Sequence, residues 1–291
     1  MRVCFTLTLM AMVVWAYWPI FNALHAKWAS DPQYSHGYLV PVLAFGILAI
    51  RRDRMKSHGN GLSSAGIRYL AIGALMQMLG GYLYFDWLSA ISLIATCLGL
   101  FGTYGGRPGL AWGWPSCLYL GYMVPLPYFI ETGLSRPLRG IATQWSTWVL
   151  QTIGSPAISE GNIILVERGR VAVAEACSGL SMFLAFFAIA TALLIVVRKP
   201  FLETFIMIAS VPVIAVISNV IRIVVTGIAI DLRGGEFTQT WVHDQIGWLM
   251  MPIAVSLLFL ELWVIGKLLI PVPSEVSFAT ALSQPIPIKA P

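Results

Sequence analysis

"LSMFLAFFAIATALLIVV", residues 180–197, is an apolar run without a single charge, and Arg198 and Lys199 follow it directly. An α-helix rises about 1.5 Å per residue, so this run covers most of a hydrocarbon core about 30 Å thick. A helix that is apolar on every side has no face for water. The run therefore predicts a membrane-spanning helix that ends at a basic loop.

The composition of the whole chain agrees with this prediction. Hydrophobic residues make up 58% of the sequence and charged residues only 11%, whereas a soluble domain carries about 25% charged residues. So few charges cannot cover a water-soluble surface. The net charge of +5 is therefore expected to mark cytoplasmic loops, and no nucleic-acid partner is expected.

Apolar runs predict an all-α polytopic membrane protein with about eight transmembrane helices. The integral membrane domain covers residues 1–270, and the proline-rich residues 271–291 are expected to form a disordered cytoplasmic tail. The expected spans are residues 3–24, 38–50, 67–85, 87–104, 110–127, 180–197, 201–222 and 248–267.

Basic residues set the orientation of these spans. In an eight-span count, one side of the membrane receives Arg51, Arg52, Arg54, Lys56, Arg68, Arg107, Arg198, Lys199 and Lys267. Lys and Arg favour the cytoplasmic side, so both chain ends are expected inside the cell. The outer side then holds most of the acidic residues and the long loop 128–179. Four arginines in that loop do not overturn the assignment, because long loops cross largely regardless of charge.

The outer loop 128–179 is the only sizeable segment between spans. Residues 133–154 carry apolar side chains at helical spacing and predict an amphipathic helix along the membrane surface. The stretch "GNIILVERGRVAVAEAC", residues 161–177, predicts a hairpin of two strands, with Gly169 in the turn. This hairpin would bring Glu175 and Cys177 to the outer end of the span 180–197.

Cys177 differs from the other three cysteines in its predicted depth. Cys4, Cys97 and Cys117 fall at the inner end of a span or inside one, where cysteine is ordinarily a small apolar residue. Cys177 alone falls on the outer side, next to Glu175, Ser178 and Gly179, and has no partner there for a disulfide. The sequence thus favours a reactive thiol at this position over an inert one.

Arg222 and Asn219 interrupt the apolar segment "SNVIRIVV", residues 218–225. They are three residues apart and share one face of a helix. A charge within a span is costly and usually functional, although an arginine near the interface can also extend to the lipid headgroups. An amide beside the arginine favours the functional alternative.

His243 lies just before the last span, also on the outer side, and His36 precedes the second span there. Cys177, Arg222 and His243 thus reach one membrane face from three chain segments. A histidine can take the thiol proton and return it to a leaving amine, and an arginine can stabilise the anionic intermediate. Asn219, Glu175 and His36 are supporting candidates. No metal site and no cofactor are expected, because no HExxH pattern is present.

These blocks resemble the exosortase/archaeosortase family. The resemblance rests on "VAEACSGL", "SNVIRI" and "HDQIGW" in that order, with "YSHGYLVP" at residues 34–41 and the "PLP" turn at residues 125–127 further upstream. It implies a membrane cysteine endopeptidase and transpeptidase of the bacterial inner membrane, with its active site on the periplasmic face. Cys177, Arg222 and His243 match the family's catalytic positions.

The resemblance also implies the substrates. They are exported proteins with a C-terminal sorting signal of the PEP-CTERM type, in which a short motif, a membrane helix and a basic cluster follow one another. A thioester acyl-enzyme and a link to exopolysaccharide and surface-protein biogenesis belong to the same expectation. Membrane lipid is the other expected partner. The sequence indicates neither the oligomeric state nor the final acyl acceptor.

Two other classes compete with this interpretation. An intramembrane serine protease needs a GxSx motif ahead of a helix, and an intramembrane glutamate protease needs paired glutamates on a span. Ser178 lacks the leading glycine of that motif, and no expected span carries paired glutamates. A transporter or a polysaccharide-export subunit would use proline-interrupted spans such as the one around Pro212, but it would also show repeat symmetry, which is absent here. Tolerance of Cys177→Ala distinguishes a transporter from an enzyme.

Overall fold

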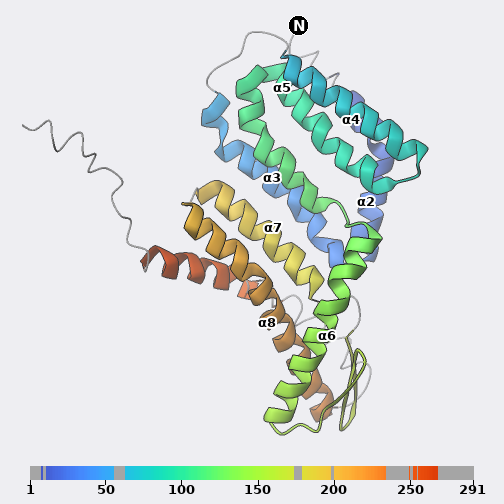
Figure 1. Ribbon diagram of the computed structural model, residues 1–291, viewed down its shortest axis with the longest axis vertical. Helices are drawn as coiled ribbons and strands as arrows, with labels where there is room; N and C mark the ends of the chain where they lie inside the picture. Colours follow the sequence, from blue (N-terminus) through green and yellow to red (C-terminus); the bar gives the residue numbers. More distant parts are fainter. Residues whose placement is uncertain are drawn as a thin grey trace, which may run out of the picture.

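The computed structural model describes residues 8, 11–55, 63–173, 179–197, 200–233, 249, 252–253 and 255–267 of the chain. In this part of the chain a bundle of helices carries a smaller lobe, built from the ends of two long helices and a three-stranded sheet (Figure 1). The predicted helical membrane protein with a small β element is confirmed. The predicted tail 271–291 lies outside the described residues.

The elements follow the apolar runs of the sequence. In chain order they are α2 (Trp18–Ser30), η1 (Pro32–Tyr38), α3 (Leu39–Ile50), η2 (Arg52–Met55), α4 (Ser64–Tyr82), α5 (Asp86–Tyr119), η3 (Leu120–Met123), α6 (Tyr128–Thr152), β1 (Ile158–Glu160), β2 (Ile163–Val166), β3 (Gly169–Ala172), α7 (Leu180–Val197) and α8 (Phe201–Arg233). Residues 255–267 form a final helix.

Four helical stretches among the described residues are long and apolar enough to cross a membrane: Pro32–Ile50, Asp86–Met123, Leu180–Val197 and Phe201–Leu232. The count of eight spans is therefore not confirmed. One reason is that the single stretch Asp86–Met123 holds, as two arms, the expected span 87–104 and most of the expected span 110–127.

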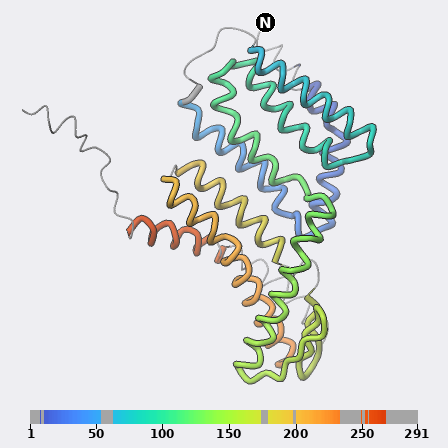
Figure 2. Tube along the Cα trace, in the orientation of Figure 1, coloured from blue at the N-terminus to red at the C-terminus, as the bar shows by residue number. Residues whose placement is uncertain are grey.

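The two arms of α5 meet at Gly106, where the chain turns back on itself (Figure 2). Gly106 has φ 62° and ψ −147°, a conformation that a side chain at this position would strongly disfavour. The arms then pack side by side: the rings of Phe101 and Trp112 lie 5.3 Å apart, edge to face. One glycine thus converts a long helix into a helical hairpin.

Glycines also decide how α4 packs against α5. The buried residues of α4 are Gly66, Gly73 and Gly80, seven residues apart and therefore on one face. A Cβ atom on Gly73 would lie 2.3 Å from the Thr96 side chain, and one on Gly80 would lie 2.2 Å from that of Ser89. The two helices approach so closely only because these side chains are absent, as in membrane helix pairs generally.

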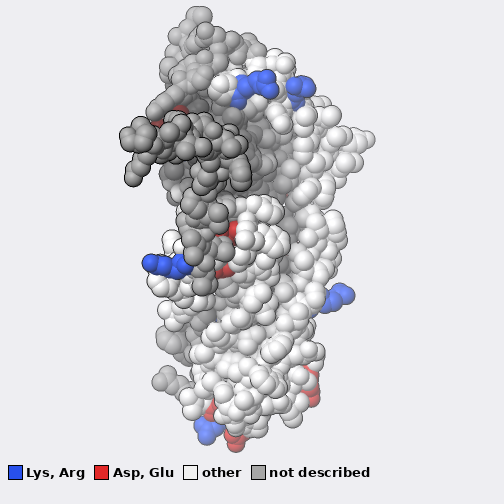
Figure 3. Space-filling view, turned by 60° about the vertical axis from the view of Figure 1, so that its left-hand side comes forward, with Lys and Arg blue, Asp and Glu red and all other residues white. Residues whose placement is uncertain are grey.

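Charged side chains lie at both ends of the molecule and also at mid-height (Figure 3). Figure 3 shows Lys and Arg at the upper end, and charges of both signs at the tip of the lobe. The upper end holds the helix ends near Arg51, Arg52 and Arg68 and the α5 turn near Arg107 (Figure 1). These basic loops therefore share one end of the bundle, as the alternation of spans predicted.

The lobe contains the long loop that the sequence placed between spans. The helix predicted at 133–154 is present as α6, and the sheet has the antiparallel order β1-β2-β3. The predicted hairpin is confirmed as β2 and β3, which pair antiparallel around Glu167 and Arg168. The structure adds β1, which lies before the predicted stretch and pairs with β2 through exposed residues that show no apolar alternation.

Gly169 also differs from its predicted role. It begins β3, and the turn before it is formed by Glu167 and Arg168. A Cβ atom on Gly169 would lie 2.8 Å from the side chain of Ile230 in α8. The glycine therefore lets the sheet approach α8.

Helix α8 joins the bundle to the lobe. Its 33 residues correspond to about 50 Å, which exceeds the roughly 30 Å of a hydrocarbon core. The first half packs on α7 and the final helix around Met207, Val211 and Leu258. The second half packs on α6 and the sheet around Leu150, Ile164 and Ile223. Residues near 219–222 therefore lie where the two cores meet.

Candidate active site

The segment that carries Asn219 and Arg222 is fully helical and buried. Asn219 is 1% exposed and Arg222 is 6% exposed, with Ser218 and Thr226 buried above and below them on the same face of α8. The hydroxyl of Thr226 donates a hydrogen bond of 2.8 Å to the backbone carbonyl of Arg222. The structure thus confirms that the arginine and the asparagine share one face, and it places that face inward.

Beside this polar face, α8 packs against α6. The side chain of Leu150 lies 3.1 Å from the place that a Cβ atom would take on Gly227, and the two helices run in the same direction (Figure 1). The buried residues of α6 are mostly small and polar, namely Ser135, Ala142, Thr143, Ser146, Thr147 and Leu150. We call the contact of α6 with the part of α8 around residues 218–227 the polar seam.

The apolar stripe of α6 lies on its other side. Trp145 and Trp148 are 57% and 60% exposed, and Leu134 and Ile141 are exposed as well. The predicted position of this helix along the membrane surface stays a prediction. The small hydroxyl residues between the apolar positions indicate the contact of α6 with α8 better than the apolar stripe does, because small side chains allow two helices to pack closely.

The entrance to α7 lies against the polar seam. Gly179 has φ +79°, and a Cβ atom there would lie 3.3 Å from the side-chain nitrogen of Asn219. On the other side of the Cys177 segment, the backbone N–H of Val173 donates a hydrogen bond of 2.8 Å to the carbonyl of Asn162, and Val173 is buried in the lobe. Both described flanks of this segment are therefore fixed.

Glu175, Cys177 and His243 lie outside the described residues, so their predicted roles stay predictions. Two of the other cysteines are described. Cys117 is buried and Cys97 is half-buried, and both pack in an apolar cluster of the α5 hairpin. Their surroundings agree with the prediction that they act as small apolar residues.

His36 lies in η1, which contacts both η3 and the helix α7 that follows the Cys177 segment. Its side chain is half-buried, with its ring 6.4 Å from that of Tyr34, and it contacts the backbone of Tyr122. His36 is therefore held in an element that packs on both η3 and α7.

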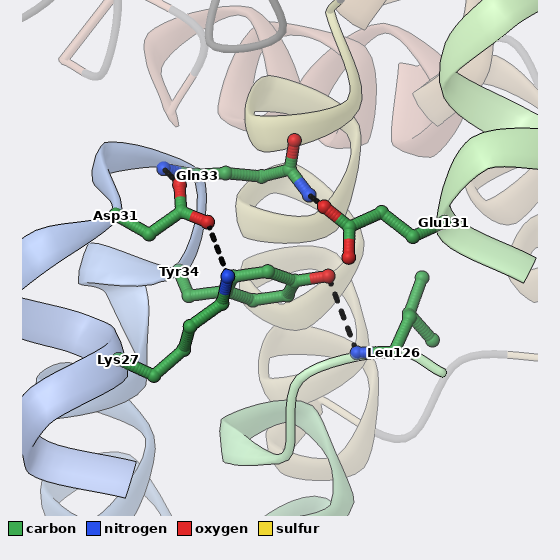
Figure 4. Close-up of polar contacts among 6 residues, drawn as sticks. All are labelled: Lys27, Asp31, Gln33, Tyr34, Leu126 and Glu131. Carbon is green, nitrogen blue, oxygen red and sulfur yellow. Dashed lines mark hydrogen bonds and ion pairs between the residues drawn. The ribbon is translucent and has the colours of Figure 1, made fainter. Parts of the chain in front are cut away.

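A network of polar contacts joins η1 to the start of α6 (Figure 4). The backbone N–H of Leu126 donates a hydrogen bond of 3.2 Å to the hydroxyl of Tyr34. The amide of Gln33 donates one of 2.9 Å to Glu131 in the first turn of α6. The stretches "YSHGYLVP" and "PLP" are thus in direct contact, which the sequence did not predict. The network fixes the direction in which α6 leaves the bundle.

Within the described residues no group of three or more His, Cys, Asp or Glu side chains is placed to hold a metal ion. Beside η1, an apolar groove of about 540 Å³ runs between the second arm of α5 and α7. Its polar contents include the hydroxyl pair of Tyr122 and Thr191, 2.8 Å apart.

The described arrangement is a bundle with a buried arginine and asparagine at the joint of the lobe, and Gly179, at the entrance of α7, lies against the asparagine. Against known protein families, residues 28–260 match the transmembrane exosortases. The chain belongs to this family. The match covers η1, the α6 lobe and the buried polar face of α8, so the membership applies to the parts just described. No curated protein and no solved structure matched the chain. Membership of the exosortases supports a membrane sorting enzyme.

Proposed function

We propose that this exosortase family member is a membrane cysteine transpeptidase that cleaves C-terminal sorting signals of the PEP-CTERM type from exported proteins. Cys177 is the nucleophile, His243 the general base and acid, and Arg222 the group that binds the developing oxyanion. The contact of Gly179 with Asn219 is the observation that carries the proposal.

This contact limits the distance between the nucleophile and the buried arginine. Cys177 precedes Gly179 by two residues, so covalent geometry keeps their Cα atoms within about 7.6 Å of each other. Gly179 lies against Asn219, and Arg222 is one helical turn further along α8. Cys177 and Arg222 can therefore both reach a peptide that is bound at the entrance of α7.

The chemistry needs no external oxidant or reductant. His243 takes the proton of the Cys177 thiol, and the thiolate attacks the scissile carbonyl to form a C–S bond. The C–N bond then breaks as His243 gives the proton to the leaving amine, which leaves a thioester. A nucleophilic acceptor attacks the thioester, and Cys177 recovers its proton.

Arg222 suits the stabilisation of the tetrahedral intermediate. The side chain is 6% exposed, and a positive charge acts more strongly on an oxyanion where water is excluded. A guanidinium offers two parallel N–H donors in a fixed plane. Asn219 is buried on the same face and supplies a further amide beside the entrance of α7.

The expected substrate geometry agrees with the shape of the molecule. The basic loops lie at one end of the bundle and the polar seam lies toward the lobe at the other (Figures 1 and 3). We infer that the basic loops face the cytoplasm and the lobe faces the periplasm of a bacterial inner membrane. A sorting helix beside the bundle would then have its outer end near Arg222 and its basic cluster inside the cell.

The deciding experiment is mass spectrometry of the C-terminus of a co-expressed substrate, with the wild-type chain and with Cys177→Ala. We expect a truncated or modified C-terminus only with the wild type, and equal membrane insertion of both chains. Cys97→Ala is the matched control, because that thiol lies in an apolar cluster, and it should process normally. Full processing by Cys177→Ala would refute the nucleophile and would favour a non-enzymatic role.

A further inference from the structure

A cavity of about 330 Å³ opens between α2, the first turns of α5 and the segment 124–126. It adjoins the groove between α5 and α7, since Val124 and Leu126 line both. We call it the α2–α5 cavity. Its walls are formed by Ile20, Ala23, Leu24, Lys27, Asp86, Trp87, Ala90, Val124, Pro125 and Leu126.

The polarity of the α2–α5 cavity changes along its depth. Its two charged residues, Lys27 and Asp86, stand at the end of α2 and the start of α5, respectively. Ile20 and Leu24 lie one to two turns further into α2, and Ala90 lies one turn further into α5. A charged mouth above an apolar interior matches an amphiphile that lies at the same depth as the surrounding lipids.

The two charged residues at the mouth differ in whether they have a partner within the protein. The ammonium of Lys27 is 2.8 Å from a carboxylate oxygen of Asp31 and lies 5.4 Å over the ring of Tyr34. The carboxylate of Asp86 is exposed and makes no hydrogen bond or ion pair with the described residues. Asp31 lies outside the cavity lining and already pairs with Lys27, so the carboxylate of Asp86 is the excess charge at the mouth and favours a cationic group beside it.

We propose that the α2–α5 cavity binds a bilayer phospholipid whose headgroup carries a primary amine. The amine donates to Asp86, the phosphate accepts from the remaining N–H groups of Lys27, and an acyl chain lies against Ile20, Leu24 and Ala90. A primary ammonium has three donors, whereas a quaternary ammonium has none. A headgroup that is anionic and has no amine is repelled by the excess negative charge at the mouth.

The bound lipid would brace the joint between the bundle and the lobe. The segment 124–126 forms one wall of the cavity, and Leu126 is held from its other side by the hydroxyl of Tyr34. Helix α6 begins two residues later, at Tyr128. A lipid at this wall therefore restricts the same turn that directs α6 toward the polar seam.

Zero-length crosslinking tests the contact directly. A water-soluble carbodiimide joins a carboxylate to a primary amine only when the two touch. We would reconstitute the full chain in phosphatidylcholine bilayers with added phosphatidylethanolamine or with added phosphatidylglycerol, treat both with carbodiimide, and map lipid adducts by mass spectrometry. We expect an adduct at Asp86 with phosphatidylethanolamine alone.

Two variants make the test specific. Asp86→Asn removes the acceptor and should lower retention of phosphatidylethanolamine in native mass spectrometry by roughly tenfold, the usual size of a hydrogen bond to a charged group. Ala23→Trp fills the mouth from an exposed position of α2 and should lower retention while leaving Asp86 in place. Glu160→Gln, on an exposed strand of the lobe, is the matched control and should change nothing.

Each result of these experiments either supports or overturns the proposal of a bound lipid. An Asp86 adduct that both cavity variants reduce supports the proposal. Equal retention of phosphatidylethanolamine by the wild type and both variants overturns it, as does equal retention of the two added lipids by the wild type. None of these readouts depends on peptide cleavage, so they hold whether or not Cys177 is the nucleophile.

Discussion

The side-chain amide of Asn219 lies against Gly179, with its nitrogen 3.3 Å from the position of a Cβ atom on that glycine. Gly179 is the described residue nearest in sequence to Cys177, and Asn219 is one helical turn from Arg222. Two stretches about 40 residues apart in the chain thus meet at the entrance of α7. A site built there depends on a close backbone approach as well as on reactive side chains.

Gly179→Ala should therefore impair the enzyme. Alanine adds a Cβ against Asn219, and at φ +79° it also strains the backbone by about 1–2 kcal/mol. We expect slower substrate processing together with a lower temperature of thermal unfolding in detergent. Gly140→Ala is the control, because a Cβ on Gly140 in α6 meets nothing within 4 Å. If Gly179→Ala processes substrate at the wild-type rate, the close approach at α7 is not needed for activity.

Arg222→Lys should lower the turnover number by roughly 10²-fold or more, the effect of losing one donor to an oxyanion. Lysine keeps the charge but loses the planar pair of donors. The measurement is single-turnover cleavage of a synthetic sorting-signal peptide in bilayers. Arg136→Lys, on an exposed position of α6, should be nearly silent. A turnover number within a few-fold of wild type for Arg222→Lys would exclude the bidentate role.

Thiol labelling should separate the cysteines by depth. A membrane-impermeant maleimide applied to intact spheroplasts should modify Cys177 and leave Cys97 and Cys117 unmodified, because these two pack in the apolar cluster of α5. The label should disappear in Cys177→Ala. Labelling of Cys177 only after the membrane is made permeable would reverse the proposed orientation of the molecule.

Gly73→Ala should loosen the contact of α4 with α5. The new methyl group would lie 2.3 Å from the Thr96 hydroxyl and 2.9 Å from its backbone nitrogen, and overpacking of this kind costs about 1–3 kcal/mol. We expect a lower unfolding temperature by scanning fluorimetry in detergent. Gly81→Ala on the same helix has open space around it and should leave stability unchanged or raise it. Equal stability of the two variants would show that the glycine face does not set the distance between the helices.

The sequence by itself determined the class of the molecule. The scarcity of charge requires a membrane protein, since too few polar groups exist to cover a globule in water. The apolar runs determined α7 and most of α8, because a long apolar run in lipid can satisfy its backbone only as a helix. The spacing of three residues from Asn219 to Arg222 also placed both side chains on one face before any tertiary contact was known.

Only the tertiary structure decided what those faces meet. The apolar stripe of α6 was the evident feature of its sequence, yet the small hydroxyl residues form the buried side against α8. Periodicity identifies a face but not its partner. The sequence did not predict the roles of Gly106 and Gly179, and it placed Gly169 in the turn instead of at the contact with α8, because a glycine acts through the backbone approach it permits and leaves no periodic signal. The hydrogen bond between Tyr34 and Leu126 could not be predicted from the sequence either, because it depends on how η1 packs on the bundle.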